Sequence, residues 1–333
     1  MDRRHAQHLL LGLALCAALP FLARAAQDEQ VVNQDEQVVD QDGQVVNQNT
    51  QTVKQDEQVF KAGAELVVLH VNVFDGRSDA VPDLPQGSFT VFEDDKPQDI
   101  SFFSAGDVPV TVGLVIDNST SMFTERELVV AGTNAFAESS HPEDEMFAIV
   151  FNEHVRHGLP DTTQFTTNRL QLRASLQRFP PGGKTAVYDA VIEALNHLDK
   201  GMYQKHVLVV LSDGGDNASR HSEQEMLDRV AMSNALVYTV VDPDVFVPGE
   251  GDCGVLKRLA KLSGGVAYFP KNSRDLVKDL EEIAGNIRRG YSIGYAPPST
   301  HVHNQTHRVK VVVRVPGRKD LSARVRNVYM ESD

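Results

Sequence analysis

The chain has 333 residues, about the length of two ordinary domains. Apolar residues make up 41% of it and charged residues 23%, which excludes collagen, a fully disordered chain and a polytopic membrane protein. The net charge of -14 has the wrong sign for binding a polyphosphate, so no nucleic-acid partner is expected. Two cysteines, Cys16 and Cys253, are too few for a disulfide framework.

The first 25 residues have the pattern of an export signal. Arg3 and Arg4 precede an apolar stretch at residues 9–22, and the small-x-small pattern that signal peptidase cleaves ends at Ala25. The stretch is shorter than the roughly 20 residues of a membrane-spanning helix. We therefore predict that residues 1–25 are a cleaved signal peptide, and that the mature protein is periplasmic, on the cell surface or secreted, without a stable membrane span. A buried N-terminal helix is the alternative.

Residues 26–60 contain a seven-residue repeat that begins QDEQVVN, QDEQVVD, QDGQVVN. Its apolar residues stand in adjacent pairs such as Val31 and Val32, whereas a coiled coil needs them alternately three and four apart. Residues 27–60 hold eight acidic residues against Lys54, a net charge of -7. This composition predicts a disordered acidic spacer. An oligomerising repeat is the alternative.

Short strands are expected on both sides of the central part of the chain. Residues 61–106 hold four β-branched and aromatic runs separated by Pro, Gly and Asp, which predicts a small β-sandwich-like module. Residues 291–333 hold three further strand-like runs, YSIGYAP, HRVKVVVRV and LSARVRNVYM. We expect these C-terminal strands to pair with the N-terminal module or with each other.

Residues 107–290 alternate apolar runs with amphipathic stretches. The runs at 108–116, 146–152, 206–212, 235–241 and 265–269 are continuously apolar, as in strands that are covered on both faces. Thr124 with Glu127, and Ser222 with Glu225, have the spacing of capping boxes and indicate helix starts. The predicted fold class is therefore α/β, with a doubly wound, mainly parallel sheet. In such sheets ligands bind beyond the carboxyl ends of the strands.

Oxygen-bearing side chains gather at the expected strand ends. Asp117, Ser119 and Ser121 follow the first strand, Thr185 opens a helix after a glycine pair, and Asp213 ends a later strand. A site with one or two carboxylates and several neutral oxygens suits Mg²⁺, which keeps part of its water shell. The alternative is that these residues are ordinary helix caps and loop polar groups.

The segments DNSTS, PGGKTAVYDA and LSDGGDN together resemble the von Willebrand factor type A (VWA) domain and its metal-ion-dependent adhesion site, over residues 108–290. The resemblance implies that Asp117, Ser119 and Ser121 form the aspartate-x-serine-x-serine loop, that Thr185 is the metal threonine and that Asp213 is the second aspartate. It also implies bound Mg²⁺, or Mn²⁺ or Ca²⁺, and a protein partner whose Asp or Glu carboxylate fills the open position.

The β module and the YSIGYAP segment further resemble the VWFA-related proteins described from acidobacteria. The function that we expect is an exported, non-enzymatic binding protein. A structural protein of the cell envelope is one alternative. A metal-dependent hydrolase is another, but no general base stands in a motif beside the metal loops. No catalytic residue is therefore assigned.

Three other patterns in the sequence could indicate different sites. Gly183, Lys184 and Thr185 resemble the end of a phosphate-binding loop, but Arg178 stands where that loop needs its first glycine. His301, His303 and His307 would place two imidazoles on one side of a strand, although exposed histidines are usually solvated. The acids of residues 242–252 are expected to form a solvated loop rather than a Ca²⁺ site.

The repeat is expected to be dispensable for folding, because residues 27–60 lack a core-forming pattern. Deleting them should leave the melting temperature of residues 61–333 within experimental error, as measured by circular dichroism. A large loss of stability, or a change of oligomeric state in light scattering, would show instead that the repeat packs or assembles.

Overall fold

The computed structural model describes residues 66–77, 79–122, 126–241, 253–298 and 305–330, and two short strands before them. The chain divides into two compact units, residues 1–62 and 63–333. In the first unit, β1 (Val38–Val39) pairs antiparallel with β2 (Val45–Val46), so the valine pairs of two successive repeats form the strands. The signal peptide and the rest of the repeat lie outside the described residues, and their predicted roles stay predictions.

A six-stranded sheet forms the centre of the second unit, in the order β12-β11-β10-β7-β8-β9. All neighbouring pairs are parallel except β8 and β9, which are antiparallel. The predicted doubly wound, mainly parallel fold is confirmed, and the antiparallel edge strand β9 is an addition to it. The strands are β7 (Thr111–Asp117), β8 (Glu145–Phe151), β9 (Val155–His157), β10 (His206–Leu211), β11 (Leu236–Val240) and β12 (Ala267–Tyr268).

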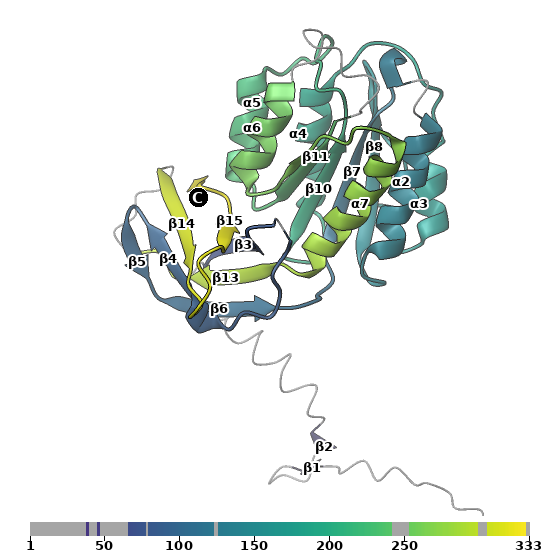
Figure 1. Cartoon of the computed structure of the whole chain (residues 1–333). Coiled ribbons are helices and arrows are strands. Elements are labelled where there is room, and N and C mark those ends of the chain that lie inside the picture. Colours follow the sequence, from purple (N-terminus) through teal and green to yellow (C-terminus); the bar gives the residue numbers. More distant parts are fainter. Residues whose placement is uncertain are drawn as a thin grey trace, which may run out of the picture. The chain divides into compact units, whose positions relative to one another are not determined.

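Helices cover both faces of this sheet, as Figure 1 shows. One face carries α2 (Arg126–Ser139), α3 (Arg169–Leu176) and α7 (Ser273–Arg288), and the other carries α4 (Val187–Leu198), α5 (Glu223–Met232) and α6 (Cys253–Ser263). Side chains along a strand alternate between the two hydrophobic cores. In β7, Leu114 joins one core and Val115 the other. This two-sided burial explains why the strands are continuously apolar in sequence.

Helix starts follow side-chain capping in several places. The predicted capping box at the start of α5 is confirmed, since Ser222 Oγ accepts from the Glu225 N–H and the Glu225 carboxylate accepts from the Ser222 N–H. Asn168 and Asn272 are the N-cap residues of α3 and α7, and the side-chain oxygen of each accepts from two backbone N–H groups of the first turn. Thr124, of the other predicted capping box, lies outside the described residues.

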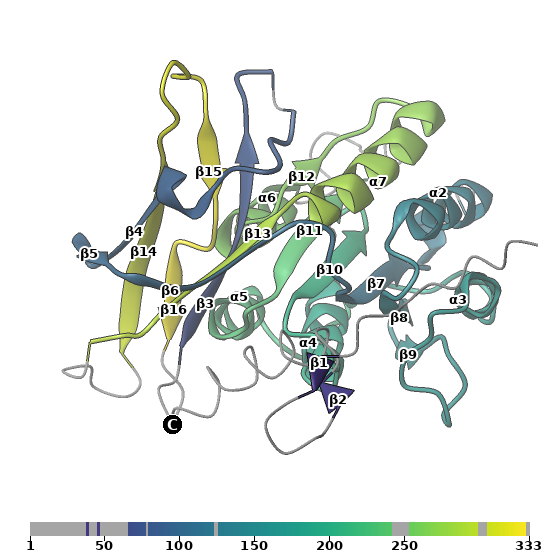
Figure 2. The same ribbon diagram turned by 90° about the horizontal axis from the view of Figure 1, so that it is seen from below.

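A β-sandwich of two four-stranded sheets packs beside the α/β part. The sheets have the orders β15-β3-β13-β6 and β16-β14-β4-β5, so each combines N-terminal with C-terminal strands. The central segment is therefore inserted between two halves of one sandwich, and Figure 2 shows β13 running from α7 into it. The strands are β3 (Val67–Phe74), β4 (Phe89–Glu93), β5 (Lys96–Gln98), β6 (Ile100–Ala105), β13 (Tyr291–Tyr295), β14 (Thr306–Val313), β15 (Ser322–Arg324) and β16 (Val328–Met330), and the short 3-10 helix η1 (Gln86–Ser88) precedes β4.

Strand β3 is buried on both faces, because it lies between the sandwich core and the α/β part. Leu69 and Val71 belong to the sandwich core, whereas Asn72 Nδ2 donates to the hydroxyl of Tyr238 in β11 at 2.8 Å. His70, which stands between Leu69 and Val71, is 5% exposed, and its Nδ1 lies 3.0 Å from Ser292 Oγ. Polar contacts thus join the two parts within one compact unit.

The burial of His70 predicts a specific pH dependence of stability. Burial, and next the positive charges of Lys205 and Arg326, lower the pKa of the His70 imidazole from 6.5 to about 3. Between these pH values the unfolded chain binds a proton that the folded chain excludes, so this histidine costs stability as the pH falls through the interval. The loss approaches about 1.4 kcal/mol per pH unit.

Urea unfolding of wild type and His70→Gln between pH 7 and about pH 4 measures this contribution. The free energy of unfolding of wild type should fall more steeply than that of the variant. Other groups titrate in both proteins, so only the difference is informative, and the exposed histidine variant His154→Gln serves as the matched control. Parallel curves for wild type and His70→Gln would contradict the prediction.

Candidate metal site

The candidate site lies where three loops meet beyond the carboxyl ends of β7 and β10. These strands are parallel neighbours, with Ile116 paired to Leu211, so the residues that follow them emerge side by side. Asp117 ends β7 and Asp213 lies two residues beyond β10. The topology therefore brings two distant aspartates to the edge where doubly wound sheets bind ligands.

Asp117 is buried, and both of its carboxylate oxygens accept hydrogen bonds. It is 3% exposed, its Oδ1 accepts from the Ser119 N–H at 2.9 Å, and its Oδ2 accepts from Ser212 Oγ at 2.7 Å. Burial raises the pKa of this carboxyl to about 6, against the hydrogen bonds from Ser119 and Ser212, and the charge of Asp213 adds to the rise. A buried carboxylate of this kind favours a nearby positive charge.

A chain of oxygen atoms continues from this loop to the second aspartate. Ser119 Oγ and Ser121 Oγ lie 3.0 Å apart, and Ser121 Oγ donates to Asp213 Oδ2 at 3.0 Å. Asp213 Oδ1 accepts from the Gly215 N–H at 2.9 Å. Ser121 is part of the 3-10 turn η2 (Thr120–Met122), which curls the loop back toward its own start. The structure thus brings four of the five predicted side chains into one hydrogen-bonded network.

Thr185, the fifth residue, lies in a loop that is bound to both of the others. The Gly182 N–H donates to the carbonyl of Asn118 at 2.9 Å, which ties this loop to the first. The Thr185 N–H donates to Asn217 Oδ1 at 2.9 Å, which ties it to the loop after β10. Ala186, rather than Thr185, is the N-cap residue of α4, so the alternative role of Thr185 as an ordinary helix cap does not fit.

The glycine pair before Thr185 is required by the local backbone. Gly182 and Gly183 have φ angles of 135° and 91°, which side-chain-bearing residues rarely adopt. A Cβ on Gly183 would lie 1.7 Å from Glu153 Oε2. That same Glu153 oxygen accepts from the Lys184 N–H at 2.7 Å and fixes the loop from outside.

Sequence analysis did not single out several residues that hold the loops. Ser212 donates directly to Asp117 but was passed over beside Asp213. Asn118 Nδ2 donates to the carbonyl of Pro180 at 2.9 Å, and Arg126 donates to Asn118 Oδ1 at 3.1 Å. Asn118 stands between two predicted ligand residues and Ser212 stands directly before a third, which is the signal that the sequence offered for them. These contacts hold the loops together.

The donor set fits a divalent cation. It consists of hard oxygens, from Asp117 and Asp213 and from the hydroxyls of Ser119, Ser121 and Thr185. Among the residues that the structure describes, none forms an ion pair with either aspartate. Two neighbouring carboxylates, one of them buried, therefore have no salt-bridge partner among the described residues.

The expectation that the histidines near the C-terminus are solvated is wrong for His307, which is 6% exposed. His307 Nδ1 lies 2.8 Å from Asp94 Oδ2, and one ligand atom each from His307, Asp94 and Glu93 lies within 4.8 Å of the others. Glu93 Oε2 accepts from the hydroxyls of Tyr295 at 2.5 Å and Tyr329 at 2.8 Å. The predicted partners His301 and His303 lie outside the described residues, as do the acids of 242–252. This cluster is a polar network at one end of the sandwich.

Comparison with known proteins agrees with this geometry. Residues 112–215, which include all five site residues, match the family model described as von Willebrand factor type A domain. Together with the strand order, the match shows a VWA-like α/β fold. No curated protein sequence matches the chain. The narrower resemblance to the acidobacterial proteins stays a prediction.

Three solved structures are similar at low sequence identity. An aerotolerance-related membrane protein from Bacteroides fragilis is 17% identical, with 53% of this chain and 98% of that chain covered and a TM-score of 0.44. A von Willebrand factor type A protein from Catenulispora acidiphila is 12% identical, with coverages of 82% and 75% and a TM-score of 0.49. Manganese-loaded TRAP protein from Plasmodium vivax is 13% identical, with coverages of 67% and 96% and a TM-score of 0.43.

Metal binding is expected to raise the melting temperature. A ligand that binds only the folded state stabilises it by about 2.7 kcal/mol at roughly a hundredfold excess over its dissociation constant, or about 5–10 °C for a chain of this size. Differential scanning fluorimetry with Mg²⁺ or with EDTA measures the difference. Asp117→Ala should abolish this difference, whereas Asp161→Ala, which removes an exposed carboxylate elsewhere, should retain it. Equal melting temperatures of the wild type in Mg²⁺ and in EDTA would contradict metal binding at this site.

Proposed function

We propose that this chain is an exported, non-enzymatic binding protein whose VWA domain captures an acidic group of a protein partner through a divalent cation. Asp117, Ser119, Ser121, Thr185 and Asp213 would hold Mg²⁺, or Mn²⁺ or Ca²⁺. The observation that supports the proposal most strongly is the hydrogen-bonded network from Asp117 to Asp213, which no described cationic residue neutralises.

The chemistry of the donors favours an anionic partner group. Three of the five predicted ligand side chains are neutral hydroxyls, so a bound cation would keep more positive charge than it does in a cage of carboxylates. A cation held there would supply an open position for a carboxylate oxygen of the partner. The chain's own residues prepare this position: Ser212 and the Ser119 N–H orient Asp117, and Ser121 orients Asp213.

The alternatives are less well supported by the geometry. A hydrolase needs a general base beside the metal, and among the described residues no histidine forms a hydrogen bond with any of the five site residues. A structural protein of the envelope would depend on the repeat rather than on the metal loops. Export is inferred from residues 1–25, and none of the described helices has the length and apolar character to span a bilayer.

Capture from an envelope extract tests the proposed function. The immobilised full chain should retain partner proteins in Mg²⁺ and release them when EDTA is added. Asp117→Ala should retain none of these proteins, and Asp161→Ala should retain the wild-type set. Retention that is equal with and without EDTA would contradict metal-dependent capture and would favour the structural alternative.

Loss of the Thr185 hydroxyl and loss of the Ser119 hydroxyl should have different effects on metal affinity and on partner affinity. We expect Thr185→Ala to weaken binding of an acidic partner by about tenfold, the loss of one hydroxyl ligand, while metal affinity changes less. In the VWA domains that the chain resembles, partner binding is accompanied by coordination of the cation by the corresponding threonine and by a shift of the final helix, here α7, and we expect the same of Thr185. Ser119→Ala should weaken both metal and partner binding.

Calorimetric titration of the captured partner against each variant at saturating Mg²⁺ separates these roles. Metal affinity is titrated in parallel without the partner. Equal partner affinities for wild type and Thr185→Ala would contradict this role of Thr185. The melting temperature of each variant shows whether a loss of affinity reflects a loss of fold.

A further inference from the structure

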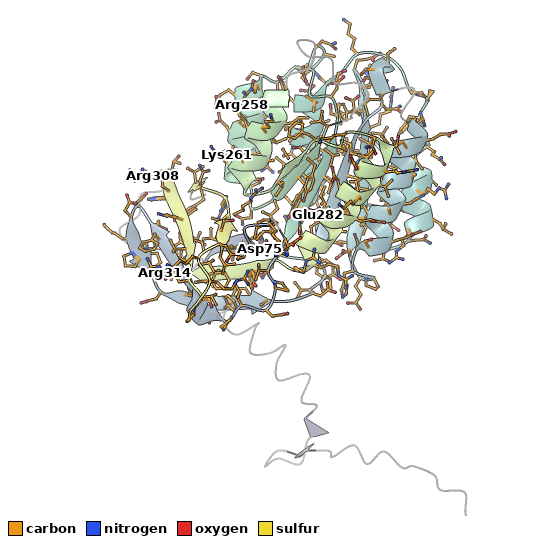
Figure 3. All side chains as sticks on the ribbon, in the orientation of Figure 1. Asp75, Arg258, Lys261, Glu282, Arg308 and Arg314 are labelled. Atoms are coloured by element: carbon orange, nitrogen blue, oxygen red, sulfur yellow. The ribbon has the colours of Figure 1, made fainter. Side chains whose placement is uncertain are left out.

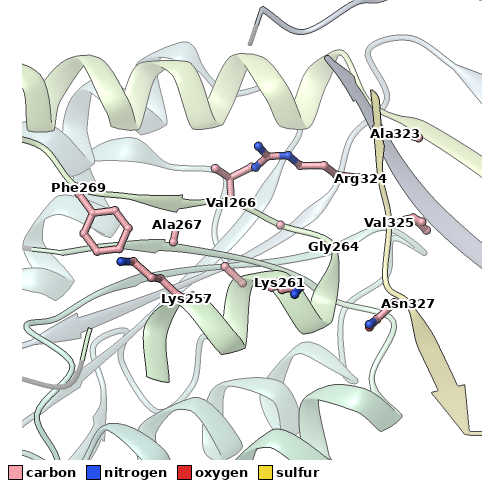
Figure 4. Close-up of a pocket in the computed structure, with 12 residues that line it drawn as sticks. Lys257, Lys261, Gly264, Val266, Ala267, Phe269, Ala323, Arg324, Val325 and Asn327 are labelled. Atoms are coloured by element: carbon pink, nitrogen blue, oxygen red, sulfur yellow. The ribbon is translucent and has the colours of Figure 1, made fainter. Parts of the chain in front are cut away.

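A groove that is lined by residues of both the α/β part and the β-sandwich lies away from the metal loops. It has a volume of about 530 Å³ and is lined by α6, by the segment from Gly264 to Phe269 and by the segment from Ala323 to Asn327. Figure 4 shows Lys257 and Lys261 extending from α6 on one side and Arg324 on β15 at the other. None of the five candidate metal residues lines it.

Both sides of the groove carry the outermost strand of a sheet. β12 ends the central sheet and pairs only with β11, and β15 ends one sandwich sheet and pairs only with β3, among the described strands. An outermost strand presents backbone N–H and C=O groups that another extended chain can pair with. Residues of two such strands therefore line one groove, and an unpaired strand edge is the feature to which peptides bind by strand addition.

Close backbone packing holds the two sides at a fixed separation. Gly264 has a φ of 87°, and a Cβ there would lie 2.4 Å from the carbonyl carbon of Val325. Arg326, which is 8% exposed, donates to Asn234 Oδ1 at 2.6 Å and to the carbonyl of Val68 at 3.2 Å. These contacts bind the segment after β15 to both parts of the unit, so the groove is formed before any ligand arrives.

The groove is positively charged in a chain whose net charge is -14. Lys257, Lys261 and Arg324 are exposed, no acidic residue lines the groove, and none of the described residues forms an ion pair with these three cations. Lys257 Nζ lies 4.6 Å from the centre of the Phe269 ring, which is itself 41% exposed. Figure 3 shows Lys261 near the end of α6 that approaches the sandwich.

We propose that this groove binds an extended acidic segment of a partner protein by strand addition, independently of the metal site. Alternate side chains of an added strand point to opposite sides. Carboxylates on one side would then meet Lys257, Lys261 and Arg324, while apolar side chains on the other would contact the groove around Val266 and Phe269. The open strand edges favour a peptide over a small anion, because only a peptide satisfies their backbone groups.

The test uses fluorescence anisotropy with the full chain and a labelled peptide of about eight residues, a common strand length, that alternates aspartate and valine. This peptide should bind in the presence of EDTA. The double variant Lys257→Glu with Lys261→Glu, and separately Arg324→Glu, should weaken binding by about tenfold, since attraction becomes repulsion. The matched control, Arg173→Glu with Lys200→Glu, reverses two exposed charges outside the groove and should bind as wild type does.

Two further peptides separate charge from strand addition. A peptide that alternates lysine and valine should not bind, and the aspartate peptide with alternate amides N-methylated should lose affinity because it cannot donate to a strand edge. Equal binding of either peptide would overturn the proposal, as would binding that the groove variants leave unchanged. Binding that EDTA or Asp117→Ala abolishes would overturn it as well, by placing the peptide at the metal loops.

The result is independent of the proposed function of the metal site. If Mg²⁺ has no effect on partner capture, the affinity of the groove variants for the aspartate peptide still decides whether the groove binds it. Conversely, failure of the peptide to bind leaves the metal-dependent capture intact. The groove variants are all at exposed positions, and their melting temperatures test whether each remains folded.

Discussion

The structure of the candidate site depends on one buried carboxylate. Asp117 lies at the end of a central strand, is 3% exposed, and is oriented by its own loop and by Ser212 of the neighbouring strand's loop. A carboxylate in such a place is costly unless its hydrogen bonds are satisfied and its charge is compensated. The described residues supply the hydrogen bonds but no cation. We propose that the surrounding loops, which Asn118, Gly182 and Asn217 link, preorganise a site for a divalent ion.

In our proposal, the β-sandwich completes a second binding surface beside the α/β part. Its sheets are completed by strands from both ends of the described unit, and its contacts with the α/β part run through Asn72, Arg326 and the backbone at Gly264. The outermost strands β12 and β15 come to line one basic groove as a consequence. Metal-dependent capture at one site and strand addition at the other would let one partner bind at both. Binding at the first site would then raise the effective concentration of the partner at the second, so the overall affinity would exceed that of either site alone.

Much of this architecture was predictable because buried parallel strands leave a strong signal. The runs at 108–116 and 206–212 are continuously apolar since both faces are covered, and the ligand residues follow them directly. β9 was missed because Val155–His157 is short and mostly polar. The pairing of β3 with β13 joins residues more than two hundred positions apart, so the sequence left it as one of two alternatives for the C-terminal strands. The groove was not predictable for the same reason, because its two walls come from distant segments.

The central claim is that the oxygen cluster around Asp117 binds a divalent cation, and Mn²⁺ titration followed by electron paramagnetic resonance tests it most directly. The signal of free Mn²⁺ should be suppressed until one ion per chain is bound, and Mg²⁺ should restore it by competition. Asp117→Ala should leave the signal at its free value from the first addition. A titration curve that is the same for wild type and Asp117→Ala would contradict the account.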